Sequence, residues 1–147
     1  MGLFDKVMKK DETPVKFNPQ QAMSACCLLA VAADGVIEQD EVNRIVTSLS
    51  GMKLFSHTGM NDLGKMLQNS AKLVEQRGAG AVMVAAKQGL TPEQRETGFA
   101  IAADLTLADG IMAKKEQAFL EEFYKALEIQ EDQALKIVEV IAIKNRG

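Results

Sequence analysis

The residues best suited to chemistry are carboxylates gathered around two Asp-Gly pairs. Asp34-Gly35 and Asp109-Gly110 each close a long apolar stretch and each precedes an acidic or mixed-charge one. Carboxylates that converge from a turn and from the start of the next helix suit hard cations such as Ca²⁺ or Mg²⁺. The candidate cation ligands are Asp34, Glu38 and Glu41 around the first pair, and Asp104, Asp109 and Glu116 around the second.

The spacing of these carboxylates excludes an EF-hand. Asp34 precedes Glu41 by seven residues, and Asp109 precedes Glu116 by the same distance. This separation is too short for an EF-hand loop, and the alternating acidic ladder of such a loop is missing. Any cation site would therefore have another architecture.

Two other interpretations of the same residues remain open. In a purely structural one, the two aspartates accept hydrogen bonds from turn amides, and Glu41 and Glu116 lie in first helical turns, where negative charge suits the helix dipole. In the other, the carboxylates form an acidic patch that docks a basic partner.

Asp104 needs a separate explanation because it interrupts an apolar stretch that we expect to be buried. An unpaired carboxylate in such a place is costly. Its partner is expected to be a helix N-terminus, Lys114 or Lys115, or a cation shared with Asp109.

The sequence shows no apparatus for catalysis. His57 stands alone in an expected exposed loop, and the adjacent Cys26 and Cys27 are interpreted as buried reduced thiols. No nucleophile set, phosphate-binding loop or zinc-protease motif is present.

The favoured function is therefore a non-enzymatic binding module. The alternatives are a metal-dependent hydrolase built on Asp104, Asp109 and Glu116, and a purely structural adaptor.

The elements that carry these residues are predicted to be helices. The chain is 47% hydrophobic but only 5% aromatic, and it lacks the alternating runs of strands. Asn18-Pro19 and Thr91-Pro92 are helix starts, each followed by an apolar helix that should run through the core. We expect an all-α, compact bundle of about seven helices. The predicted core residues are Cys26, Leu29, Ala30, Ile101, Ala102 and Leu105.

The two halves of the chain follow one plan, offset by 75 residues. In each, an apolar helix, an Asp-Gly turn and an amphipathic helix succeed one another, as in ADGVIEQDE (33–41) and ADGIMAKKE (108–116). This pattern predicts an internal pseudo-two-fold repeat.

This repeated motif, together with GLFDKV near the N-terminus, resembles the tellurite-resistance TerB family over residues 18–147. The resemblance implies a compact seven-helix fold and a stress-response role. It also implies other stress-response proteins as partners, including a TerC-like membrane protein, with the chain in the cytoplasm and reaching the inner face of the membrane through those partners.

Charge and hydrophobicity limit the kinds of partner that we expect. The net charge of −3 comes without a cluster of basic and aromatic residues, so no nucleic-acid partner is expected. No apolar segment is long enough to span a membrane, and no signal peptide is recognisable. Residues 1–17 should form a flexible arm, dispensable for folding but needed for association, with an apolar stripe of Leu3, Phe4, Val7 and Met8.

Overall fold

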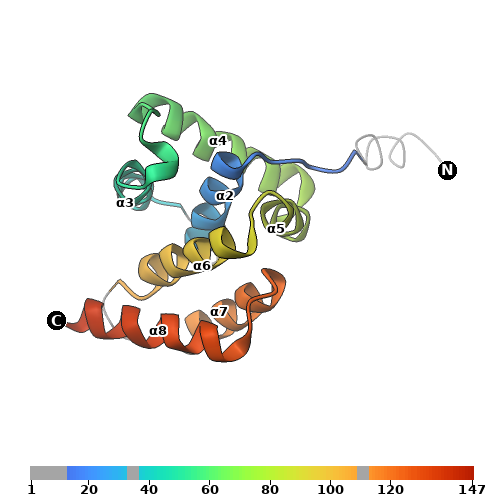
Figure 1. Ribbon diagram of the computed structural model, residues 1–147. Helices are drawn as coiled ribbons and strands as arrows, with labels where there is room; N and C mark the ends of the chain where they lie inside the picture. The colour runs from blue at the N-terminus through green and yellow to red at the C-terminus, as the bar shows by residue number, and fades with distance from the viewer. Residues whose placement is uncertain (1–12, 33–36, 109–112) are drawn as a thin grey trace.

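The computed structural model describes residues 13–32, 37–108 and 113–147 (Figure 1). These residues form seven α-helices and one short 3-10 helix and contain no strand, which confirms the predicted all-α class. The helices are α2 (Pro19–Ala32), α3 (Gln39–Ser50), η1 (Lys53–Phe55), α4 (Met60–Arg77), α5 (Ala79–Gln88), α6 (Pro92–Thr106), α7 (Lys114–Ala126) and α8 (Glu131–Arg146).

Helix α2 lies at the centre of the fold, as its composition predicts. Every residue from 22 to 31 is buried, including Ser24, whose hydroxyl donates a 2.9 Å hydrogen bond to the Gln20 carbonyl. The helix begins where Asn18 and Gln21 exchange hydrogen bonds of 2.8 and 3.0 Å between side chain and backbone. Thr91 and Gln94 make the same reciprocal pair at the start of α6.

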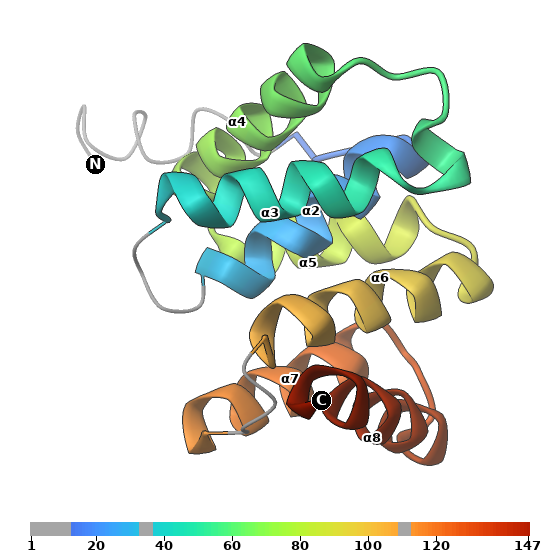
Figure 2. The same cartoon turned by 90° about the vertical axis from the view of Figure 1, so that its left-hand side faces the viewer.

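The second apolar helix, α6, packs directly against α2. In both views α6 lies between α2–α5 on one side and α7–α8 on the other (Figures 1 and 2). A close approach of the two helices is possible because α6 carries Gly98, where an added Cβ would lie 3.3 Å from the Cys26 sulfur. Five of the six predicted core residues are buried, and Ile101 is partly buried.

The two cysteines are free and fully buried, as predicted. Burial raises the pKa of the Cys26 thiol to about 12, and burial followed by the neighbouring Cys26 raises that of Cys27 further. Both therefore behave as small apolar side chains at neutral pH.

The described end of the N-terminal arm is attached to the body. Phe17 packs against the core, and the Arg77 guanidinium donates a hydrogen bond to the Thr13 carbonyl. The rest of the predicted arm, residues 1–12 with its apolar stripe, lies outside the described residues.

The turn between α7 and α8 depends on a non-glycine residue in the left-handed region. Glu128 has φ 57°, and the following amide, of Ile129, donates a 3.0 Å bond to the Tyr124 carbonyl, as in a Schellman motif. The Glu128 carboxylate reaches Lys87 on α5 at 2.5 Å. This ion pair ties the turn to a distant helix.

Two glycine positions test how closely α2, α5 and residue 17 pack. A Cβ on Gly89 would lie 2.9 Å from both the Ala22 Cβ and the Phe17 carbonyl oxygen. Gly89→Ala should therefore lower the free energy of unfolding by about 1–3 kcal/mol in a denaturant titration. Gly64, inside α4, has open space around it, so Gly64→Ala should raise stability by about 0.5–1 kcal/mol. Equal effects of the two changes would contradict this packing.

The Glu128–Lys87 pair predicts a pH-dependent contribution to stability. The hydrogen bond from Lys87, then its positive charge, lowers the pKa of the Glu128 carboxyl below its ordinary value of 4.5. The stabilisation is therefore present above pH 4.5 and is lost as the pH falls through the lowered pKa. Glu128→Gln should lower the melting temperature near neutral pH and converge with the wild type in strong acid. A constant difference across this range would refute the coupling.

Candidate functional site

Two glutamates from distant parts of the chain line one surface pocket. Glu41 belongs to α3 and Glu116 to α7, and the pocket between them has a volume of about 380 Å³. Its apolar part comes from α2, α6 and α7, and Glu122 and Lys115 add further charge. The residues that form the apolar part are Ala30, Val31, Leu105, Ala118 and Phe119.

The two glutamates are held in place by the starts of their own helices. Each is the third residue of its helix, and each is half-buried. The Oε1 atom of Glu41 accepts a 3.1 Å bond from the Glu38 amide, and that of Glu116 accepts a 3.0 Å bond from the Ala113 amide. The predicted role in the first helical turn thus coexists with a place in the pocket.

The other predicted ligands around the two turns either do not line this pocket or lie outside the described residues. Glu38 is exposed just before α3, where its backbone rather than its carboxylate makes the contact with Glu41. Asp34 and Asp109 lie outside the described residues. Within the described part of the chain, no three His, Cys, Asp or Glu side chains are grouped so that they could hold a metal ion.

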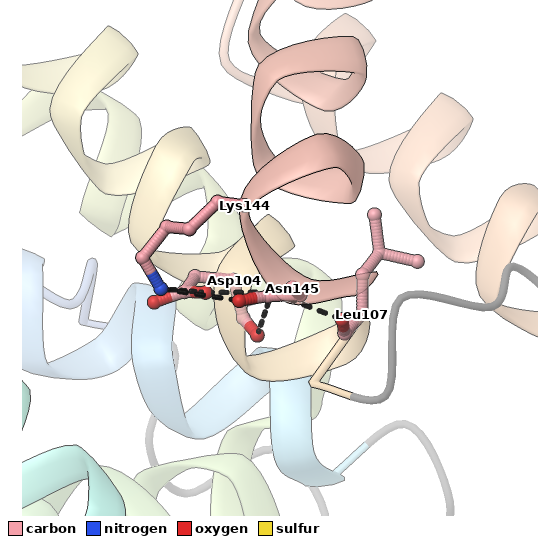
Figure 3. Close-up of polar contacts among 4 residues, drawn as sticks. All are labelled: Asp104, Leu107, Lys144 and Asn145. Atoms are coloured by element: carbon pink, nitrogen blue, oxygen red, sulfur yellow. Dashed lines mark hydrogen bonds and ion pairs between the residues drawn. The ribbon is translucent and has the colours of Figure 1, made fainter. Parts of the chain in front are cut away.

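Asp104 faces the end of α8 and is not among the residues lining the pocket with Glu41 and Glu116 (Figure 3). Its Oδ1 atom accepts bonds of 2.8 Å from the Asn145 amide and 3.2 Å from the Lys144 ammonium. The carboxylate is about one-third exposed, so the predicted need for a partner is met at the surface. The prediction that Lys114 or Lys115 pairs with Asp104 was wrong, because the ammonium group that contacts this carboxylate belongs to Lys144 of α8.

Asn145 also closes the end of α6. Its Nδ2 atom donates a 3.0 Å bond to the carbonyl of Leu107, the buried residue that follows the last turn of α6 (Figure 3). The free carbonyls at a helix end need such donors. Asp104 and Asn145 together therefore form a junction between α6 and α8.

His57 is exposed in the loop after η1, as predicted. Sequence reasoning missed Glu122 as a pocket residue. Glu122 lies two helical turns after Lys115 on α7, so the two side chains share one face of the helix and both reach the pocket. This helical spacing was the signal in the sequence that could have identified Glu122. None of the helices within the described ranges is long and apolar enough to cross a membrane.

The chain matches the model of a described protein family. A family model described as "Tellurite resistance protein TerB" matches residues 20–138, which is most of the chain. No curated protein and no solved structure matches.

The α6–α8 junction predicts a measurable loss on removal of the Asn145 amide. Asn145→Ala leaves the Leu107 carbonyl and the Asp104 carboxylate without this donor, so the free energy of unfolding should fall by about 1–3 kcal/mol. Asn43→Ala, an exposed change on α3, is the matched control and should stay within about 0.5 kcal/mol of the wild type. Indistinguishable denaturation curves for the two variants would show that the junction contributes nothing.

Proposed function

Because the chain belongs to the tellurite-resistance TerB family, we propose that it is a non-enzymatic stress-response module that binds a divalent cation at the pocket lined by Glu41 and Glu116. The observation that supports this is that these two side chains line the same pocket. They occupy the same position in two helices, yet they are far apart in the sequence.

The chemistry of the pocket favours Ca²⁺ or Mg²⁺. Two carboxylates in one half-buried pocket repel each other, and a divalent ion relieves this repulsion. Each glutamate uses Oε1 to hold a backbone amide, and its second oxygen is the one that we assign to the ion. Glu122 supplies further negative charge at the pocket.

We propose that Asp34 and Asp109 complete the ligand set. Each precedes, by five residues in the sequence, the first residue of the helix that carries one of the two glutamates. Asp104 is left out of this set because its carboxylate is engaged with Lys144 and Asn145. Glu38 lies outside this ligand set, and its exposed negative charge adds to the attraction for the cation.

The role of such a module is regulatory or structural. TerB proteins are not known as an enzyme family. The described residues that line the pocket include three carboxylates, one lysine and one threonine, but no serine, cysteine or histidine. We propose that the cation-loaded surface docks other stress-response proteins, among them a TerC-like membrane protein, from the cytoplasmic side of the membrane. The apolar part around Phe119 gives a partner's side chain a surface to rest on.

Isosteric amide variants test the cation site. Calorimetric titration of the wild type with Ca²⁺ and Mg²⁺ should give binding heat, and either ion should raise the melting temperature. Glu116→Gln and Asp109→Asn should each weaken binding by at least about tenfold. Glu116→Gln should cost the ion-free protein little, because the oxygen of the new amide can still accept the hydrogen bond from the Ala113 backbone.

Two control variants separate this site from the alternatives. Asp104→Asn and Glu121→Gln should keep wild-type affinity, because neither side chain lines the pocket. A lost response in Asp104→Asn would instead place Asp104 in the ligand set. No heat and no melting shift in the wild type at millimolar ion would eliminate a useful Ca²⁺ or Mg²⁺ site.

A further inference from the structure

A second groove, apolar rather than acidic, lies between α7 and α8 away from the proposed cation site. It has a volume of about 140 Å³, and most of its lining is apolar side chains. Phe99 of α6 contributes to it, with Leu120 and Tyr124 from α7 and Leu135 and Val138 from α8. An apolar groove between two helices is a common docking place for an amphipathic segment.

The groove adjoins exposed apolar side chains of α8. The described chain exposes six large hydrophobic residues, and three of them, Leu135, Val140 and Ile143, lie on this helix. Leu135 lines the groove itself and is 57% exposed. Exposed apolar side chains gathered on one helix indicate a contact surface.

The groove also carries negative charge at its edge. Glu121 of α7 and Glu131 of α8 both line it, and both are exposed. A matching occupant therefore has an apolar stripe and nearby positive charge.

Residues 1–12 of this same chain have that chemistry. Leu3, Phe4, Val7 and Met8 follow helical spacing. Lys6, Lys9 and Lys10 lie among and after them, and Asp5, Asp11 and Glu12 balance their charge, so this segment offers local positive charges without a net positive charge. We propose that the α7–α8 groove receives the N-terminal arm of a second copy of this chain. Part of the apolar stripe occupies the groove, and the lysines face Glu121 and Glu131.

The second copy, rather than the same molecule, is favoured by where the arm leaves the body. The Thr13 carbonyl is held by Arg77 at the end of α4, and Phe17 lies against Gly89. In both views residues 13–17 run on the α4–α5 side of α6, whereas α7 and α8 lie on the other side (Figures 1 and 2). These two helices supply most of the lining of the groove. When two copies exchange arms, each groove receives the arm of the other copy, and the result is one symmetric dimer.

The test uses the full-length chain and a labelled synthetic peptide of residues 1–12. In sedimentation velocity, the wild type should self-associate with rising concentration. Phe4→Asp and Leu135→Glu should each weaken that association by roughly tenfold or more, the effect of losing a central interface side chain. Val84→Glu is the matched control, since Val84 is 55% exposed on α5 and does not line the groove.

Fluorescence anisotropy then identifies the groove directly. The peptide should bind the Phe4→Asp protein, whose own arm is disabled, and binding should weaken when Leu135→Glu is added. Unchanged melting temperatures would show that Leu135→Glu remains folded. A wild type that stays monomeric would overturn the exchange. Peptide binding that is lost in a Val84→Glu background but kept with Leu135→Glu would overturn the assignment of the groove.

Discussion

Ten consecutive residues of α2 are buried, and the positions of the other helices follow from that burial. A helix without a solvent-facing side needs neighbours around its whole circumference, and α2 has them in α3, α4, α5 and α6. Each leucine taken out of water in this way contributes roughly 2 kcal/mol. One of these neighbours, α6, approaches α2 at Gly98, a residue without a side chain to separate the two helices.

The same packing brings the acidic residues together. Because α2 and α6 contact each other, Val31 near the end of α2 and Leu105 near the end of α6 share one pocket. The helices that follow, α3 and α7, then place Glu41 and Glu116 at that pocket. The apolar core thus determines where the two carboxylates lie, and the capping bonds fix their direction.

Most of the fold could be predicted from signals between residues that are neighbours in the sequence. Pairs such as Asn18 with Gln21 and Thr91 with Gln94 depend on neighbouring residues only, so the helix starts could be read from the sequence. The partner of Asp104 could not, because Lys144 and Asn145 lie about 40 residues away and only tertiary packing brings them near. The shared pocket of Glu41 and Glu116 was missed for the same reason, although both residues were candidates. The internal repeat stays a prediction, and so does the arm as a separate unit.

The buried thiols have a kinetic consequence. Both cysteines of the chain are fully covered, and the reactive form of a thiol is the thiolate, which their raised pKa values make rare. Alkylating reagents and oxidants in solution therefore meet no accessible sulfhydryl on the folded molecule. Modification of Cys26 requires that α2 leave its neighbours, so the rate of alkylation measures how often the core opens. The chain thus carries its own reporter of opening at the helix on which its fold depends.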